Sequence, residues 1–472
     1  MSMRHGSDGK DLSRRDALRY GLMTAAGLVV AGPRLFGAQP ATQPATLPPN
    51  VLGLPDSPDP ASAKPRPPLG KGKAKAVIQI WLWGGPAHLD TFDPKPEAGP
   101  DYCGPFEKPI ETNVPGIRIC EMLPLLAQQA DKYAIIRSMT HGNDGHETAA
   151  YLVQTGREPG GKLVYPSLGA IVAHFKAFAA GYKGLIPPYI VLTQPQGRFS
   201  EAGFMGPKYK PFATGGDPNA AQFAVEGIVA AGVTRQRQEA RRELLHTLDP
   251  VRSMLGDDPE LAALSEAEKQ AYDLILGDEG KVFDLSEEPD AVRLAYGRNT
   301  FGQSCLVARR LVERGFPYVT INYGGWDTHS NHFPTMRTKL PQMDRGVAAL
   351  LQDLSNRGLL DTTIVWWSGE FGRTPKIDYK PPWTGGRHHY GRCFCAMLAG
   401  GGFRGGCVVG ESDATGSNVK SRPVYPIDLL ASIYEMLGID LNATLPNPNG
   451  APVPLMPSPG EVRSGGILTE LM

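Results

Sequence analysis

The sequence predicts an α/β protein with a mainly parallel central sheet and helices on both faces. Several short runs are apolar almost without interruption, as in strands that are buried on both sides; the clearest lie at 76–83 and 362–367. Segments with apolar residues at helical spacing separate these runs. Strands that alternate with helices in this way are typical of a parallel sheet. A chain of 472 residues is long enough to bury a large core of this kind.

The predicted elements follow one another from residue 76 onwards. Strands are expected at 76–83, 133–137, 188–193, 317–322, 362–367 and 394–398. Helices are expected at 123–130, 149–154, 167–178, 291–314, 343–356 and 428–437. The Gly- and Pro-rich residues 195–220 are expected to form a surface loop. The charged segment 233–284 is expected to form a helical insert that caps the site or presents an interaction face.

Composition sets both ends of the chain apart from the folded domain. Arg14 and Arg15 precede a short apolar run at 21–32, which is similar to a twin-arginine export signal; the alternative is an amphipathic surface helix. The expected division is a signal at 1–38, a proline-rich linker at 39–73, the folded domain at 74–440 and a C-terminal tail at 441–472. We therefore expect export by the twin-arginine route to the periplasm or cell surface, and no transmembrane segment in the mature chain.

Charge and cysteine content exclude several classes of function. The chain has 48 Lys plus Arg and 48 Asp plus Glu, so nothing in the net charge indicates nucleic acid or an acidic membrane as a partner. None of the six cysteines forms a Cys-x-x-Cys pair, so a zinc–thiolate site is not expected. One or two disulfides would be compatible with export, whereas Cys305 is expected to be a buried core residue of a helix.

Acidic and imidazole side chains gather in three glycine-rich turns in the second half of the chain. Asp327 and His329 follow the strand expected at 317–322, and Glu370 follows the strand expected at 362–367. The third turn has the sequence Gly-Arg-His-His at 386–389. Carboxylates and imidazoles are ligands of zinc and other hydrolytic divalent ions, and loops that follow parallel strands meet at one edge of a sheet. These turns therefore predict a divalent-metal site.

The candidate ligands divide into two sets. The ligands of a first ion would be Asp327, His329, Glu370 and either His388 or His389, with His332 as a replacement for His329 or an addition to it. The ligands of a second ion would be His88, Asp90, Asp144 and His146. Arg373 or Arg387 would bind the anionic group of a substrate through paired N–H donors. Any single histidine here is more commonly structural, so the prediction depends on the coincidence of several clusters.

Four motifs carry a resemblance to a known family. They are Gly-Gly-Pro-Ala-His-Leu-Asp-Thr-Phe-Asp-Pro-Lys-Pro at 84–96, Gly-Trp-Asp-Thr-His at 325–329, Gly-Glu-Phe-Gly-Arg-Thr-Pro at 369–375 and Gly-Arg-His-His at 386–389. From about residue 75 to 440 the chain resembles the bacterial domain-of-unknown-function family numbered fifteen-oh-one. That family is frequent in planctomycete-type genomes, usually carries twin-arginine signals, and is grouped with the alkaline phosphatase and sulfatase superfamily. The resemblance implies an alkaline-phosphatase-like fold.

The chain departs from the family pattern at three places. Ala87 stands where the family often has Ser, and His388 stands where it often has Asp, so that His389 takes the position of the family histidine. His146 falls on the position of the sulfatase cysteine, so a formylglycine mechanism is not expected. The remaining candidates for the nucleophile are Thr148, the only nearby hydroxyl, and a hydroxide held by the metal.

The leading hypothesis is an exported metal-dependent hydrolase of phosphate or sulfate esters with a metal-activated nucleophile. Its cofactor would be a divalent metal, with zinc favoured and manganese or calcium as alternatives, and its substrate an anionic ester, for instance on a polysaccharide. The competing hypothesis is a catalytically degenerate member that acts as a cell-surface binding or interaction protein, with the insert at 233–284 as its docking face. A third hypothesis, a phosphomutase-like isomerase, would need Thr148 to accept phosphate. The sequence predicts no oligomeric state.

Overall fold

The computed structural model describes residues 71–194, 201–221 and 279–472, together with eight isolated positions between 52 and 243. The predicted export signal and almost all of the predicted linker lie outside the described residues. Most of the predicted helical insert at 233–284 lies outside them too. These three predictions therefore remain predictions.

The core of the fold is an eight-stranded sheet with the strand order β12-β4-β11-β8-β1-β7-β5-β6. Its strands are β1 Ala76–Trp81, β4 Tyr133–Met139, β5 Tyr189–Leu192, β6 Phe212–Ala213, β7 Tyr318–Asn322, β8 Thr363–Ser368, β11 Phe394–Gly400 and β12 Cys407–Val409. Every pairing in this sheet is parallel except the two that β11 makes with β4 and β8. The predicted α/β fold with a mainly parallel sheet is confirmed.

Strand β1 lies between β7 and β8 and is buried along its whole length. Its side chains alternate between the two faces of the sheet, as in any strand. Ile78 and Ile80 face one apolar core, whereas Val77 and Trp81 face a second one. Because both faces are covered, the strand has no polar face, which explains why its sequence is an apolar run without alternation.

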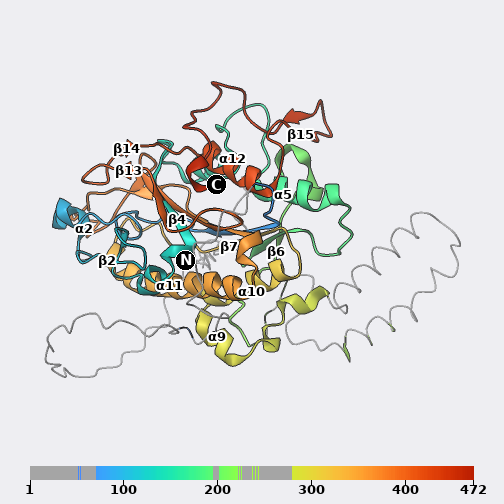
Figure 1. Cartoon of the computed structure of the whole chain (residues 1–472), viewed down its shortest axis with the longest axis horizontal. Helices are drawn as coiled ribbons and strands as arrows, with labels where there is room; N and C mark the ends of the chain where they lie inside the picture. The colour runs from blue at the N-terminus through green and yellow to red at the C-terminus, as the bar shows by residue number, and fades with distance from the viewer. Residues whose placement is uncertain are drawn as a thin grey trace, which may run out of the picture. The chain divides into compact units, whose positions relative to one another are not determined.

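Helices cover both faces of this sheet (Figure 1). Helices α9 Asp290–Tyr296, α10 Thr300–Glu313 and α11 His332–Asn356 contribute to the first core. Helices α4 His146–Thr155, α5 Leu168–Lys176 and α12 Pro426–Leu437 contribute to the second. Two one-turn helices, α2 Pro100–Cys103 and α3 Pro124–Ala127, precede β4.

Short two-stranded ladders lie outside the main sheet. Four of them are β2 Ile110–Glu111 with β3 Arg118–Ile119, β9 Gly372–Arg373 with β10 His389–Tyr390, β13 Glu411–Ser412 with β14 Val419–Ser421, and β15 Thr444–Leu445 with β16 Val453–Pro454. The last of these is in the predicted C-terminal tail. That tail also packs onto α12, because Asp428 accepts hydrogen bonds from the N–H groups of Gly465 and Gly466.

The helix expected at 291–314 is two helices in the structure, α9 and α10. Gly297 separates them with φ of 92°, a conformation that favours glycine. Asn299 then caps α10, because its side chain accepts a hydrogen bond from the N–H of Gly302. A cap residue inside an apolar pattern was therefore overlooked in the sequence.

The helix expected at 343–356 begins earlier, at His332, and contains Pro341. A proline inside a helix removes one backbone hydrogen bond and usually predicts a boundary. Here Met336, Leu340 and Met343 are buried on the sheet side, so the apolar face continues through the proline. Burial of that face offsets the missing bond.

Two short edge strands were not predicted. β6 lies in the expected surface loop 195–220, and β12 follows the glycine-rich turn after β11. Both occupy an edge of the sheet, where a strand of two or three residues needs only one partner.

The structure contains no disulfide among its six cysteines. All six are free, although one or two disulfides would have been compatible with export, and Cys305 is buried in α10 as predicted.

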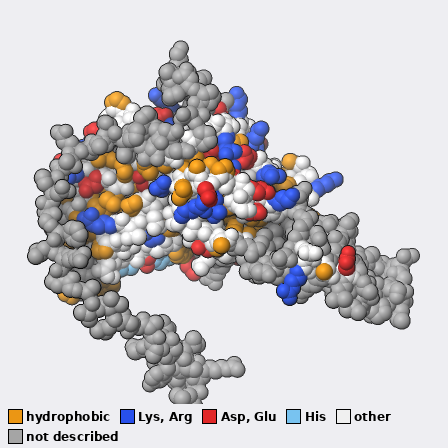
Figure 2. All heavy atoms as spheres, turned by 90° about the horizontal axis from the view of Figure 1, so that it is seen from below, with side chains coloured by type: hydrophobic (Ala, Val, Ile, Leu, Met, Phe, Trp, Pro, Cys, Tyr) orange, Lys and Arg blue, Asp and Glu red, His pale blue; other side chains and the backbone are white. Residues whose placement is uncertain are grey.

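The surface carries charges of both signs. Figure 2 shows basic and acidic side chains interspersed on the face that it displays. Within the described part of the chain, the helices are all too short or too polar to cross a membrane.

The buried carboxyl of Asp344 on α11 should make stability depend on pH. It accepts the N–H groups of Leu125 (2.9 Å) and Leu126 (2.7 Å), yet burial raises its pKa to about 7 from the usual 3.8. Between these two values the folded state binds a proton that the unfolded state has lost, so the free energy of unfolding should fall as pH rises.

Asp344→Asn should remove this contribution. We expect the unfolding free energy of the unchanged protein to fall relative to that of the variant as the pH rises from about 4 to about 7. Urea titrations at several pH values measure both free energies. Asp217→Asn is the control, because Asp217 is exposed and also accepts a backbone N–H. Parallel pH profiles for the Asp344 variant and the unchanged protein would contradict the prediction.

Candidate metal centre

The candidate site lies where four strands end at the same edge of the sheet. β1, β4, β7 and β8 run in the same direction, so their carboxyl ends meet at one edge. The segments that follow them supply Gly84, His146, Asp327 and Glu370, respectively. A fifth residue, His389, is brought in by the short β9–β10 ladder, in which it pairs with Arg373.

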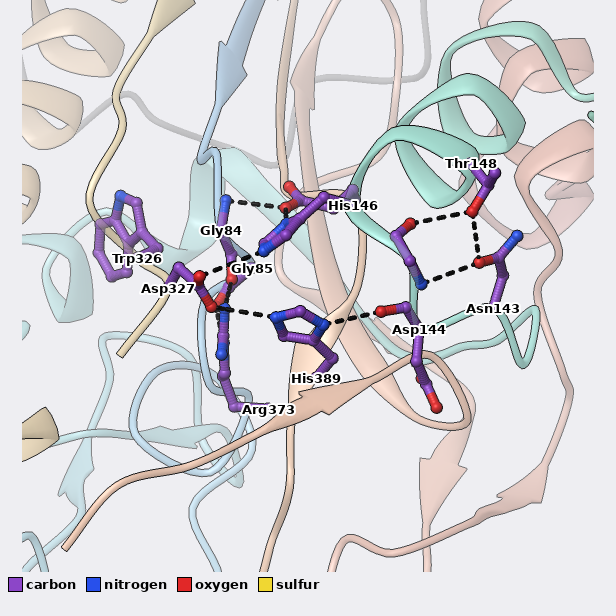
Figure 3. A network of polar contacts seen from close by, with 12 residues as sticks. Gly84, Gly85, Asn143, Asp144, His146, Thr148, Trp326, Asp327, Arg373 and His389 are labelled. Atoms are coloured by element: carbon purple, nitrogen blue, oxygen red, sulfur yellow. Dashed lines mark hydrogen bonds and ion pairs between the residues drawn. The ribbon is translucent and has the colours of Figure 1, made fainter. Parts of the chain in front are cut away.

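Three histidines surround the carboxylate of Asp327, and we call these four residues the metal cluster. His146 Nε2 lies 3.2 Å from Asp327 Oδ2. His329 Nε2 and His389 Nε2 lie 3.0 and 3.1 Å from Asp327 Oδ1. Figure 3 shows His146 and His389 pointing at Asp327 from different elements. Among the described residues, His146, Asp327 and His389 have ligand atoms all within 4.8 Å of one another.

The outer nitrogens of two histidines determine which ring nitrogen carries the proton. His146 Nδ1 lies 2.7 Å from Glu370 Oε1, and His389 Nδ1 lies 2.7 Å from the carbonyl oxygen of Asp144. Both partners only accept hydrogen bonds, so each Nδ1 carries the proton. Each Nε2 of a neutral ring then presents a lone pair to the cluster, as in histidines that bind metals.

The inward-facing atoms of the cluster need a cation between them. His329 Nε2 and His389 Nε2 are 2.9 Å apart, and both approach the acceptor Asp327 Oδ1. Lone pairs at such distances repel one another unless a proton or a metal ion lies between them. The buried Oε2 of Glu370 also has no hydrogen-bond partner among the described residues. Three imidazoles and one carboxylate therefore fit a divalent ion that prefers mixed nitrogen and oxygen ligands.

The electrostatics of Asp327 and His146 favour a positive charge, whereas burial lowers the pKa of His329. Burial alone would raise the pKa of Asp327, but the hydrogen bond and charge of Arg373 lower it to about 2, with help from His329 and His146. The hydrogen bond to Glu370 raises the pKa of His146. The carboxylate is therefore ionised at neutral pH, and a site that attracts a proton to His146 also attracts a metal cation.

Arg373 supports Asp327 instead of facing a substrate as predicted. Its side chain is fully buried and forms an ion pair with Asp327 Oδ1. The same guanidinium donates to the carbonyl oxygens of Gly84, Gly85 and Arg387. Since its donors are used within the protein, Arg373 positions Asp327 and the surrounding turns.

Gly84 allows the end of β1 to approach Asp327. Its φ is 109°, and a Cβ atom at this position would lie 2.2 Å from the backbone nitrogen of Asp327. Any other residue would push the two turns apart. The N–H of Gly84 donates to Glu370 Oε1 at 2.9 Å, so it also fixes the carboxylate that orients His146.

Aromatic side chains pack against the histidine rings. Trp83 stacks on His146 with ring centroids 5.8 Å apart, and Phe371 stacks on His389 with centroids 4.7 Å apart. These contacts restrict the rotation of both imidazoles. A ligand that is already oriented loses less side-chain entropy when it binds a metal.

His88 and Asp90, predicted as ligands of a second ion, are both buried and have partners outside the metal cluster. Asp90 bonds Arg387 at 2.8 and 3.0 Å and His332 at 2.7 Å, and we call these three residues the buried triad. All three are almost completely buried. His88 Nε2 lies 2.8 Å from the carbonyl oxygen of Gly416. The carboxylate of Asp90 is thus neutralised by the protein, and Arg387 is not placed to bind a substrate.

The remaining predicted residues lie beside the cluster. Glu370 contacts the outer nitrogen of His146, and His388 contacts the outer nitrogen of His329 at 2.8 Å, so neither points at Asp327. Thr148 turns away, with its hydroxyl donating to Asn143 and to the carbonyl of Gly145 (Figure 3). The structure therefore brings together four of the predicted residues and surrounds them with others.

One polar contact beside the metal cluster was not predicted from the sequence. Asp378 Oδ2 lies 3.2 Å from His388 Nε2. Its only sequence signal is an acidic residue between two of the motifs, in a loop rich in Pro and Gly. The partnership of His332 with Asp90 was likewise overlooked, because 242 positions separate the two residues.

Breaking the buried triad should destabilise the fold. Asp90→Asn would leave the buried charge of Arg387 without its partner, which costs about 3–5 kcal/mol. We expect urea unfolding to show a loss of this size, whereas Asp290→Asn, which removes an exposed partner of Arg298, should cost less than about 1 kcal/mol. Equal effects of the two substitutions would show that the triad contributes no more than a surface ion pair.

Comparisons with known proteins show what the chain is similar to. Partial structural similarity extends to the lipoteichoic acid synthase LtaP from Listeria monocytogenes, with 9% identity, a TM-score of 0.38, and coverage of 86% of this chain and 79% of that chain. A sulfatase from a Pseudoalteromonas species is 14% identical, with a TM-score of 0.33 and coverage of 78% and 68%. Alkaline phosphatase from the Antarctic bacterium TAB5 is 10% identical, with a TM-score of 0.33 and coverage of 78% and 99%. No match was found among curated proteins. The sequence pattern described as "Protein of unknown function (DUF1501)" matches residues 74–464, and the chain belongs to that family.

Proposed function

We propose that this protein is an exported metal-dependent hydrolase of phosphate or sulfate esters. The observation that carries the proposal is the metal cluster, in which imidazole nitrogens converge on the ionised Asp327. Clusters of this composition at the carboxyl edge of a parallel sheet are suited to hydrolysis assisted by a metal ion. If the export signal predicted at 1–38 is used, the proposed reaction would take place in the periplasm or at the cell surface.

Zinc is the ion that the donor set favours. Zinc prefers nitrogen and sulfur ligands with some carboxylate, and it can expand from four to five ligands, which would admit a water beside the four side chains. Calcium takes six to eight oxygen ligands, and the metal cluster has only Asp327 as an oxygen donor. Manganese is the second choice, because it accepts both carboxylate and imidazole.

Each residue of the site has a separate role in this proposal. A bound divalent ion would lower the pKa of water and polarise an ester oxygen. His146, His329 and His389 would hold the ion together with Asp327. Glu370 and the carbonyl of Asp144 keep two of the imidazoles in the tautomer that binds metals. Arg373 keeps Asp327 ionised and in place.

We expect the attacking group to be water. His146 takes the sequence position of the sulfatase nucleophile and faces Asp327 as a ligand. The hydroxyl of Thr148 is bonded to Asn143 and Gly145. With Arg373 and Arg387 committed to the protein, the ion would be the main binding partner of the anionic ester group. A polysaccharide is a suitable carrier of such an ester.

A surface-binding protein without activity is the second candidate. The observation that favours it is the buried triad, in which Asp90 and Arg387 are bonded within the protein. The second ion of a two-metal site would then lack a ligand, and only one ion would be present to bind the ester. Metal binding without hydrolysis of any aryl phosphate or sulfate would support this candidate.

The test combines metal content with activity. Purified protein should contain about one zinc per chain, hydrolyse an aryl phosphate or aryl sulfate, and lose activity with a chelator and regain it with zinc. Asp327→Asn and His389→Gln should each lower metal affinity and activity by about 100-fold or more.

Thr148→Ala is the matched control, because this side chain lies beside the cluster without contacting it. Its activity should stay close to that of the unchanged protein. A large loss with Thr148→Ala and normal metal content would identify a hydroxyl nucleophile instead. Metal-free protein without activity under all conditions would refute the hydrolase.

A further inference from the structure

His329 enters the metal cluster differently from the other two histidines. Its Nε2 faces Asp327 Oδ1 and His389 Nε2, at 3.0 and 2.9 Å. Its Nδ1 faces another imidazole, the Nδ1 of His388, at 2.8 Å. An imidazole is able to donate or accept, so this contact alone leaves the tautomer of His329 undetermined.

A carboxylate on the far side of His388 resolves the choice. Asp378 Oδ2 lies 3.2 Å from His388 Nε2. An ionised carboxylate only accepts, so His388 carries its proton on Nε2, and the Nδ1 of a neutral His388 is bare. That Nδ1 must then accept the proton of His329 Nδ1. The remaining nitrogen of His329, Nε2, presents its lone pair to the metal cluster.

We propose that Asp378 and His388 form an outer relay that sets the tautomer of His329 and thereby completes the metal centre. The two relay residues are positioning residues, because neither contacts the inner face of the cluster. They do for His329 what Glu370 does for His146. The inference rests on the proposed metal centre, but it concerns the ligand set and not the reaction.

The loop that carries Asp378 is built to keep the relay in place. The carbonyl oxygen of Asp378 accepts the N–H groups of Gly385 and Gly386, and its Oδ1 accepts the N–H of Lys380 at 3.0 Å. The N–H of His388 donates to Thr374 Oγ1 at 3.0 Å. Asp378 is thus bonded to the turn that precedes His388, and His388 is bonded to Thr374, the residue after β9.

The far end of this loop is packed against the ligand turn. A Cβ atom on Gly386 would lie 1.7 Å from the carbonyl oxygen of His329, so only glycine fits there. Trp383 packs on both relay-side rings, with centroids 5.7 Å from His329 and 5.0 Å from His388. These contacts of Gly386 and Trp383 fix the distance between His329 and His388.

Three substitutions in the full chain test the relay. His388→Phe removes the acceptor and should lower zinc affinity about 10- to 100-fold, measured by competition with a chromophoric chelator. His388→Asp places a carboxylate directly opposite His329 Nδ1, so it should restore the affinity close to that of the unchanged protein. A His388→Asp variant as weak as His388→Phe would overturn the proposal.

Asp378→Asn tests the direction of the relay. With its oxygen retained by the N–H of Lys380, the amide NH₂ would face His388 Nε2 and reverse both tautomers. Asp440→Asn is the control, because exposed Asp440 accepts the N–H of Asn442 in the same kind of turn, at 2.9 Å. Zinc affinity should fall for Asp378→Asn and stay unchanged for the control.

Nitrogen-15 NMR of the zinc-loaded protein gives a readout that is independent of activity. With labelled imidazoles, and His329→Gln used for assignment, His329 should carry its proton on Nδ1. His388→Asp should keep this tautomer, and Asp378→Asn should move the proton to Nε2. A proton on Nε2 in the unchanged protein would overturn the relay, whereas absent hydrolysis with normal zinc binding would affect only the proposed function.

Discussion

The ionised carboxylate of Asp327 is the constraint around which the candidate site is arranged. It follows β7, where burial works against its charge, and Arg373 is the group that compensates most strongly. Arg373 can do so only because its own charge is surrounded by the carbonyl oxygens of Gly84, Gly85 and Arg387. The three imidazoles then gather around a negative charge that is already in position. A fixed negative charge surrounded by imidazole nitrogens attracts a cation, and so the site is suited to bind one.

Two layers of polar contacts hold the turns around the metal cluster in place. The inner layer orients the imidazoles through Glu370, the carbonyl of Asp144 and His388. The outer layer is the buried triad, which connects the turn after β1 to the start of α11 and to the residue before His388. Because the three residues of the triad are buried, their charged and polar groups depend on one another for solvation. Such a network keeps turns from distant parts of the chain in a constant relation.

Much of the fold was predictable because it depends on local patterns. Apolar runs such as 318–322 and 363–368 are strands, and the glycine-rich turns after them carry Asp327 and Glu370 as expected. The failures have physical causes of their own. The start of α11 was missed because burial of its apolar face outweighs Pro341, and the break between α9 and α10 because a single cap residue decides it. Short edge strands carry too few residues to give a pattern.

For the site, the sequence by itself determined which chemical groups are present and that they lie at strand ends. Strand periodicity and the rule that parallel strands share an edge are sufficient for that. Only the tertiary structure decided the role of each group. Asp90 and His332 carry the same kinds of side chain as the cluster but are paired with each other, and Asp90 also pairs with Arg387. Glu370 contacts the outer nitrogen of a candidate ligand and is not a ligand itself. The physical reason is that a side chain's role depends on its partner, and these partners are up to 297 positions apart along the chain.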